Sequence, residues 1–130
     1  MITFTIPGQP VPKGRPRGAL PRKGDLLPGD DPKAIRFYTP ARTKIYERKV
    51  GVCAKQAGVR PTDNEVAVSA KFYLKDRRKV DVDNLMKAVL DGLNRVAYAD
   101  DKQVWAIQAL RRIDPENPRA EVTITERAEG

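Results

Sequence analysis

Histidine is absent from this sequence of 130 residues, and the chain contains a single cysteine, Cys53. The lack of histidine excludes Ser-His-Asp and Cys-His nucleophile systems, together with every metal site that needs an imidazole ligand. A lone cysteine excludes an intrachain disulfide and a cysteine-rich zinc site, and it fits a reducing cytosol. Any chemistry must therefore come from carboxylates, lysine, arginine, hydroxyl groups or a hard metal ion.

Long hydrophobic runs are also missing. No apolar stretch approaches the roughly 20 residues that cross a bilayer, and Met1 is followed by Ile-Thr-Phe-Thr-Ile, which is not the pattern of a signal peptide. The sequence therefore predicts a soluble, intracellular protein with no membrane partner. The length predicts one compact domain over residues 1–130. Because a core of this size is modest, a homodimer is a reasonable way to bury more surface.

The positive charge is concentrated in the first half of the chain. The formal net charge is +8, and residues 1–60 contain 13 Lys and Arg against 4 Asp and Glu, whereas residues 61–130 contain 12 against 13. Such an asymmetry favours a segment that faces a polyanion beside an acidic site. A solvated basic loop explains the charge equally well, so charge alone does not decide between the two interpretations.

The apolar pattern predicts the order β-α-β-α-β-β. Strict alternation predicts strands over residues 1–6, 65–74, 103–113 and 119–125. A helical period predicts one helix with Thr39 as N-cap and Pro40 as its first residue, ending at Gly58, and a second helix from Val82. The fold class is therefore α/β, a mixed α+β arrangement with helices packed on a mixed sheet. The turn over residues 114–118 predicts that the last two strands form an antiparallel hairpin.

A basic loop rich in proline and glycine is predicted over about residues 7–38. Unless the loop is a plain insertion, six of its cations suit contacts with phosphates: Lys13, Arg15, Arg17, Arg22, Lys23 and Lys33. The polar face of the first helix extends this surface with Arg42, Lys44, Arg48, Lys49 and Lys55. Cys53 and Trp105 are interpreted as packing residues, rather than as a reactive thiol and a dimer contact.

The densest chemistry lies around Asp81 and Asp83. In an extended approach to the second helix, a spacing of two puts both carboxylates on one side. Like charges held together favour a cation between them, and Mg²⁺ uses one or two carboxylates with substrate phosphate and water. Lys87 follows Asp83 by one helical turn. Asp100 and Asp101 offer a further carboxylate, and these segments can converge if the flanking strands are neighbours.

A purely structural interpretation of these acids is also open, and from spacing alone it is favoured. Asp81 or Asp83 can cap the second helix and favour its positive end. Asp83, Lys87, Asp91 and Arg95 are each four residues apart, which predicts a ladder of surface ion pairs. The tripeptide D-x-D is common and is a weak signal by itself.

A long ordered motif changes this balance. The stretch from Asp76 to Asn94 is DRRKVDVDNLMKAVLDGLN, and ADDKQV follows at residues 99–104. Together with IPGQPVPKGRPR at residues 6–17 and YTPART at residues 38–43, this sequence closely resembles the RusA family of Holliday junction resolvases, in particular its phage and prophage members. The resemblance covers nearly the whole chain, apart from about residues 18–36.

The resemblance implies an Mg²⁺-dependent endodeoxyribonuclease, with Mn²⁺ as a substitute, that acts as a homodimer. It would nick two opposed strands of a four-way DNA junction, in recombination and repair, in the cytoplasm of a bacterial or phage-infected cell. The resemblance also implies that Asp81, Asp83 and Asp101 are the metal-binding carboxylates. Lys87 would be the essential lysine beside them, and Asp100 an accessory acid.

For such a substrate, the basic loop and the first helix are expected to bind the DNA arms. The residues expected to contact the DNA are Lys13, Arg15, Arg17, Arg22, Lys23, Arg42, Lys44, Arg77, Arg78 and Lys79. Two alternatives stay open: a non-catalytic protein that binds branched DNA, in which the acids only cap and pair, and a metal-dependent nuclease that acts on forks, flaps or RNA.

Overall fold

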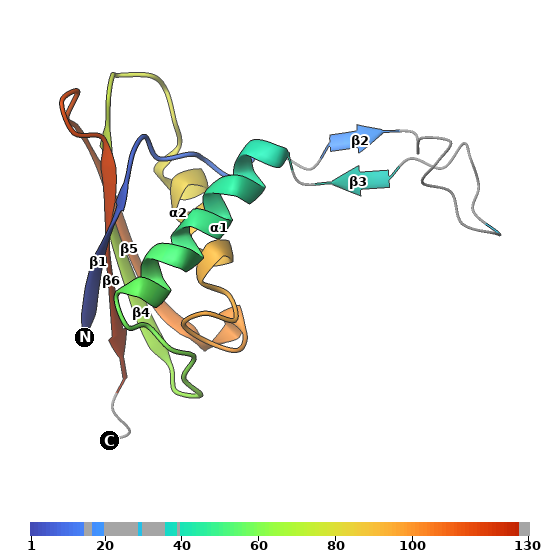
Figure 1. Ribbon diagram of the computed structural model, residues 1–130, viewed down its shortest axis with the longest axis vertical. Helices are drawn as coiled ribbons and strands as arrows, with labels where there is room; N and C mark the ends of the chain where they lie inside the picture. The colour runs from blue at the N-terminus through green and yellow to red at the C-terminus, as the bar shows by residue number, and fades with distance from the viewer. Residues whose placement is uncertain (15–16, 20–28, 30–35, 39, 128–130) are drawn as a thin grey trace.

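The computed structural model describes residues 1–14, 17–19, 29, 36–38 and 40–127, and Figure 1 shows its helices and strands. The elements are β1 (Ile2–Pro7), β2 (Arg17–Ala19), β3 (Arg36–Tyr38), α1 (Ala41–Gln56), β4 (Val66–Leu74), α2 (Val82–Leu93), the 3-10 helix η2 (Asp101–Gln103), β5 (Val104–Ile113) and β6 (Arg119–Glu126). The four predicted strands and both predicted helices are present, with ends within one or two residues of the predicted ones. Pro40 takes the N-cap position of α1, and Thr39, the predicted N-cap, lies outside the described residues.

Four strands form one mixed sheet in the order β1-β6-β4-β5. Strand β6 is antiparallel to both β1 and β4, whereas β5 is parallel to β4. The mixed α+β class, with helices packed on a mixed sheet, is therefore confirmed. The last two strands run in opposite directions from the 114–118 turn, and β4 lies between them. The β4–α2–β5 crossover places β5 beyond β4, which leaves the other side of β4 free for β6.

The core lies between this sheet and the two helices, which cover the same face of the sheet (Figure 1). Alternate residues of β4, such as Val68 and Phe72, are buried there, and they meet the apolar stripe of α2. Leu85, Val89 and Leu93 of that stripe have no exposed surface. This packing fixes the start of α2 beside the end of β4.

Two short strands interrupt the loop that was predicted over residues 7–38. Strands β2 and β3 pair in antiparallel register, from Arg17 with Tyr38 to Ala19 with Arg36. Neither segment contains proline, so every residue in it can donate a backbone N–H to a ladder. The pairing satisfies backbone groups that an irregular loop would leave to water.

Two packing predictions have different outcomes. Cys53 is half-buried against the core, as expected. Trp105 is 54% exposed, and the Arg127 guanidinium lies 5.1 Å from its ring centroid. The packing interpretation of Trp105 is wrong, because a register shift between Val66 and Ala67 interrupts the pairing of β5 with β4 beside this residue. Within the described ranges, no helix has both the length and the apolar character needed to cross a membrane.

Candidate active site and basic surface

Asp81 and Asp83 flank the first residue of α2. Asp81 is the N-cap residue, yet its carboxylate makes no capping hydrogen bond within the described helix. The amide of Asn84 approaches the Asp81 carboxylate, with 3.4 Å between Nδ2 and Oδ2. The Asp83 side chain is 77% exposed in the first turn. Asp81 and Asp83 therefore occupy the positions that favour the positive end of the helix, as the structural interpretation expected. Neither makes a capping hydrogen bond within the described helix, and their oxygens remain open to solvent.

Lys87 lies one turn after Asp83, and its Nζ is 3.4 Å from Asp83 Oδ2. The predicted ion-pair ladder does not continue beyond this pair in the described residues. Asp91 is bound by Lys13 instead, at 2.9 Å, and Arg95 lies past the end of α2 with φ 66°. An exposed pair of this kind contributes about 0.3–0.5 kcal/mol, so Lys87 is held only weakly.

Lys13 ties the N-terminal segment to both helices. Its Nζ is 2.7 Å from Glu47 of α1 and 2.9 Å from Asp91 of α2, and its backbone N–H donates to the carbonyl of Asn84. Burial disfavours its charge, but the hydrogen bonds to Glu47 and Asp91 raise the pKa of Lys13 overall. The ammonium that the sequence predicted at a DNA phosphate is thus engaged by two carboxylates.

Asp100 and Asp101 form a tight turn before β5. The Asp100 side chain accepts from the backbone N–H of Lys102 at 2.9 Å, while Gln103 accepts from the N–H of Asp100 at 3.0 Å. The bond to the Lys102 backbone lowers the pKa of Asp100, and the neighbouring Asp100 side chain raises the pKa of Asp101. The charge of Asp91, in the last turn of α2, adds to that increase.

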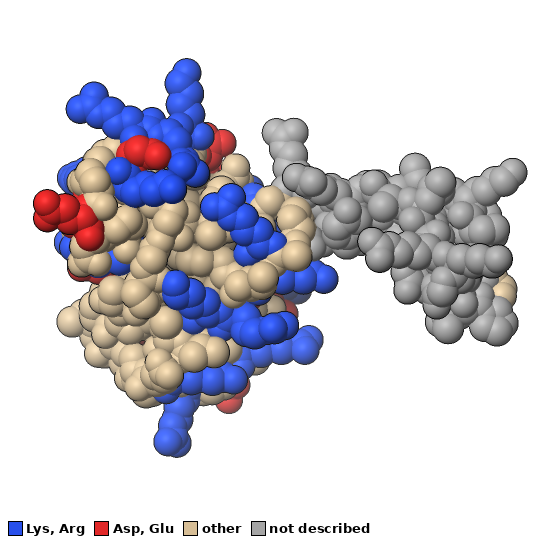
Figure 2. Space-filling model, turned by 45° about the horizontal axis from the view of Figure 1, so that its top comes forward, with Lys and Arg blue, Asp and Glu red and all other residues tan. Residues whose placement is uncertain are grey.

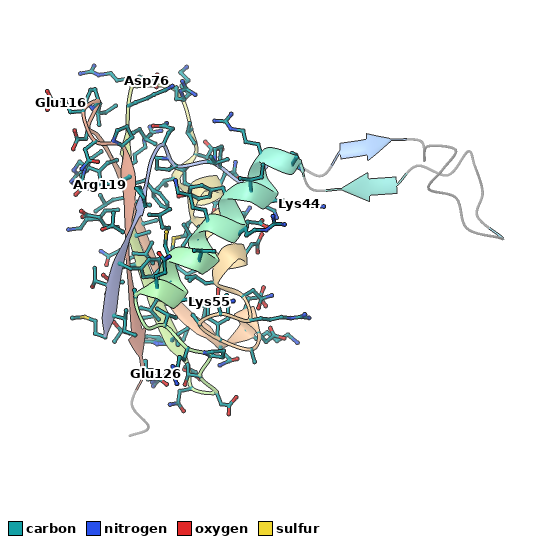
Figure 3. The ribbon with its side chains drawn as sticks, in the orientation of Figure 1. Lys44, Lys55, Asp76, Glu116, Arg119 and Glu126 are labelled. Atoms are coloured by element: carbon teal, nitrogen blue, oxygen red, sulfur yellow. The ribbon has the colours of Figure 1, made fainter. Side chains whose placement is uncertain are left out.

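Asp101 lies at the opposite end of the molecule from Asp81. Gln103 donates to the carbonyls of Thr62 and Asn64, and both residues also donate to Glu126. Figure 3 shows Glu126 at one end of the sheet and Asp76, which precedes Asp81 on the same connection, at the other. Helix α2 has 12 residues and a length of about 18 Å. This length separates Asp81 from Asp101.

The expected convergence of the three segments within one chain is therefore wrong. Strands β4 and β5 are neighbours but run parallel, so the end of β4 and the beginning of β5 lie at opposite edges of the sheet. Consistently, no group of three or more acidic or cysteine side chains that could hold a metal ion occurs among the described residues. Asp81 and Asp83 come together, and Asp100 and Asp101 do not join them.

A basic surface surrounds the connection between β4 and α2. Arg78 makes two bonds to Asp76, with Nε 3.0 Å from Oδ1 and Nη2 3.2 Å from Oδ2, which lowers the pKa of Asp76. Arg77 and Lys79 are exposed beside this pair. Figure 2 brings this end of the molecule forward and shows Lys and Arg side chains gathered around few acids.

The remaining predicted DNA contacts are distributed between α1 and the N-terminal segment. Arg42 and Lys44 are exposed on the first turn of α1, and Lys44 extends away from the sheet (Figure 3). Arg17 belongs to β2. Arg15, Arg22 and Lys23 lie outside the described residues.

Two arginines at the end of β5 were missed by the sequence interpretation. Arg111 and Arg112 line clefts next to the Asp76–Asp81 connection. The sequence indicates their role only through their position at the carboxyl end of a predicted strand. In a parallel β-α-β unit the carboxyl ends of both strands meet at one edge, where α/β sheets bind their ligands.

The donor set at the start of α2 fits a hard divalent cation. Asp81 and Asp83 supply exposed carboxylate oxygens from positions two residues apart, and neither makes a capping hydrogen bond in the described helix. Mg²⁺ needs no more than one or two protein carboxylates when phosphate and water complete its six ligands. Lys87 supplies a cation beside them that can face a second negative group.

Comparison with known proteins gives a family match. The family model described as endodeoxyribonuclease RusA matches residues 7–125. The uncharacterised protein YqaN of Bacillus subtilis is 33% identical, over 96% of this chain and 96% of its own length. The crossover junction endodeoxyribonucleases RusA of Escherichia coli and Shigella sonnei are 36% identical over 47% of this chain. The chain matches about half of the length of these last two relatives (52%).

Proposed function

The chain belongs to the RusA family of endodeoxyribonucleases, and from this we propose that it is an Mg²⁺-dependent Holliday junction resolvase. It binds a four-way DNA junction as a homodimer and nicks two opposed strands, in recombination and repair. Residues 1–130 act as a single nuclease domain, in the cytoplasm of a bacterial or phage-infected cell. The observation that carries the proposal is the pair Asp81 and Asp83, two exposed carboxylates two residues apart that make no capping hydrogen bond in the described helix.

The residues at the start of α2 have different roles in phosphodiester hydrolysis. Asp81 and Asp83 hold Mg²⁺, or Mn²⁺ in its place. When bound, the ion supplies a water of lowered pKa and offsets the negative charge that builds up on the phosphate. Lys87, which contacts Asp83 at an exposed position, turns its ammonium to a non-bridging oxygen of the scissile phosphate and stabilises the transition state.

The third carboxylate reaches the site from a second copy of the chain. Asp101 is separated from Asp81 of its own chain by the length of α2. In a two-fold symmetric dimer, the Asp101 end of one protomer can lie against the Asp81 end of its partner, and the operation repeats the contact at the other site. Two composite sites related in this way suit a four-way junction, which is itself close to two-fold symmetric.

The experiment that tests the metal site is the nicking of a synthetic four-way junction by Asp81→Asn and Asp83→Asn. Each variant should lose at least about 100-fold in cleavage rate, because an amide is a poorer Mg²⁺ ligand than a carboxylate. Junction binding should remain within a few-fold of wild type. The matched control is Glu116→Gln, an exposed acid in the 114–118 turn, which should cut normally. Normal cleavage by Asp83→Asn would remove the metal assignment.

Substrate class is tested by comparing a four-way junction, a fork, a flap, a linear duplex and an RNA duplex, with and without Mg²⁺. The proposal expects junction cleavage that depends on Mg²⁺. Preferential cutting of forks, flaps or RNA would make the protein a metal-dependent nuclease of another specificity. Junction binding without cleavage at any Mg²⁺ concentration would leave a non-catalytic DNA-binding protein.

A further inference from the structure

Two adjoining clefts lie where β4 and β5 end. The first has a volume of about 290 Å³ and is lined by Val80, Asp81, Val82, Leu110 and Arg111. The second also measures about 290 Å³ and is lined by Leu74, Asp76, Arg77, Arg78, Arg111, Arg112 and Ile113. Arg111 belongs to the lining of both, so it stands between the Asp81 carboxylate and a second, basic cavity, here named the arginine cleft.

Arg111 is fixed by a backbone contact next to the metal-binding acids. Its Nη1 donates to the carbonyl oxygen of Val80 at 2.5 Å, and Val80 directly precedes Asp81. The residue lies opposite Phe72 in the parallel pairing of β5 with β4. A guanidinium carries several N–H donors in a rigid plane, so the bond to Val80 leaves others for an acceptor in either cleft.

The arginine cleft has a large excess of positive charge. Four of its lining residues are arginines and one, Asp76, is a carboxylate. Asp76 is already engaged by Arg78. Among the residues that the structure describes, no ion pair involves Arg77, Arg111 or Arg112. Such an arrangement favours an anion, and planar guanidinium groups match the paired oxygens of a phosphate.

We propose that the arginine cleft binds a backbone phosphate of the DNA strand that is cut, next to the scissile phosphate at Asp81 and Asp83. Arg111 is the binding residue shared between the two positions, and Arg112 completes the contact. This inference rests on the proposed function, since it places the same DNA strand across both clefts. It assigns a role to two residues of β5, a strand that otherwise bears none of the proposed site.

The test compares Arg111→Ala and Arg112→Ala with Arg60→Ala, an exposed arginine before β4 at the other end of the sheet. Binding of a four-way junction is measured without Mg²⁺ across a range of salt concentrations, and cleavage is measured with Mg²⁺. Each cleft variant should bind about tenfold more weakly, the loss expected for one charged hydrogen-bonded contact. The slope of log affinity against log salt should be shallower by about 0.9. Arg60→Ala should match wild type.

Replacing single DNA phosphates by uncharged methylphosphonates identifies the phosphate that the arginine cleft contacts. Methylphosphonate groups are placed one at a time near the cut site of the junction strand. One position adjacent to the cut should weaken wild-type binding about tenfold and leave the affinity of Arg111→Ala unchanged. Arg112→Ala repeats the comparison with the Arg111–Val80 bond intact, which separates phosphate binding from a change in the 75–81 connection.

The outcomes separate this inference from the proposed function. Cleft variants that bind and cut like Arg60→Ala, in a wild type that resolves junctions, overturn the inference alone. A wild type that binds junctions without cutting them removes the proposed function, and the salt slopes of the cleft variants still decide whether the cleft holds a phosphate. Equal weakening of wild type and Arg111→Ala at every methylphosphonate position also overturns the inference.

Discussion

Asp83 and Asp91 show how two identical residues on one helix acquire different roles. Both lie on α2 and both are exposed. Asp91 is bound by Lys13 at 2.9 Å, a residue from a segment that is distant in the sequence. Asp83 has a contact of 3.4 Å with its own helix neighbour, Lys87. Asp83 is therefore free to bind a ligand, whereas Asp91 serves to hold the N-terminal segment in place.

A prediction at this scale concerns Lys87→Ala. The variant should lose about 100-fold in junction cleavage, because a cation beside the phosphate contributes several kcal/mol to the transition state. Its free energy of unfolding should change by less than about 0.5 kcal/mol, since the contact with Asp83 is exposed. Nicking assays and urea denaturation measure the two quantities. A variant that unfolds in buffer would instead show that the contact with Asp83 is structural.

Spacing along the chain predicted which residues of the candidate site lie together at the start of α2, and it missed the contacts of the other residues for a physical reason. Asp81, Asp83 and Lys87 lie within two helical turns, so their proximity follows from local geometry. Lys13 meets Asp91, and Arg111 meets Val80, only through the tertiary fold. The periodic patterns of a single sequence reveal helices and strands, and they do not reveal such tertiary contacts.

At the scale of elements, the two helices approach each other closely at Gly92. A Cβ atom added there would lie 2.7 Å from the carbonyl oxygen of Glu47 and 2.7 Å from Cβ of Val50, both in α1. Gly51 on the facing helix is also buried in this contact. The absence of side-chain atoms at these two positions lets α1 and α2 cover one face of the sheet together.

Gly92→Ala should therefore destabilise the protein by about 1–3 kcal/mol, the usual effect of overpacking. Helix propensity alone predicts the opposite sign, a gain of about 1 kcal/mol, so the measurement is decisive. Urea or thermal unfolding of the variant is compared with wild type and with Lys87→Ala, on the exposed side of the same helix. An unchanged or raised stability would show that α1 and α2 can move apart to accommodate the added methyl group without a loss of free energy.

The strand arrangement sets a limit on what alternation can reveal. The pattern gave the positions of β4, β5 and β6 within a residue or two, and it indicated that the last two strands run in opposite directions. It could not indicate that β4 lies between them, because half-buried strands look alike whatever their neighbours. This strand order determines which acids can lie together, because the parallel pairing of β4 and β5 keeps Asp101 away from Asp81.

At the scale of the whole molecule, the separation of these acids gives a test of the proposed dimer. Asp83→Asn and Asp101→Asn are each expected to be inactive in junction cleavage. If each site combines Asp83 of one protomer with Asp101 of its partner, a mixed dimer contains one site with both substitutions and one intact site. Mixing the two inactive proteins should therefore restore nicking of one strand.

The measurement is the rate of single-strand nicking after the two variants are unfolded and refolded together. Restored activity supports the composite site, and the expected rate is a substantial fraction of one wild-type site. Each variant refolded alone is the control. A refolded mixture that stays inactive, although sedimentation shows dimers, would place both acids of a site in one protomer or remove Asp101 from it.

The central position of β6 also has a consequence for how the protein is made. Strand β1 leaves the ribosome before the other strands of this sheet, and its partner in the sheet is β6, with Ile2 opposite Ile124. The unit β4–α2–β5 can form while synthesis continues, because its connections are local. Strand β1 must remain unpaired until residues 119–126 have been translated. The sheet is therefore completed only after β6 has been translated, and a ribosome stalled before β6 would carry a nascent chain in which the edges of β1 and β4 that β6 covers are exposed.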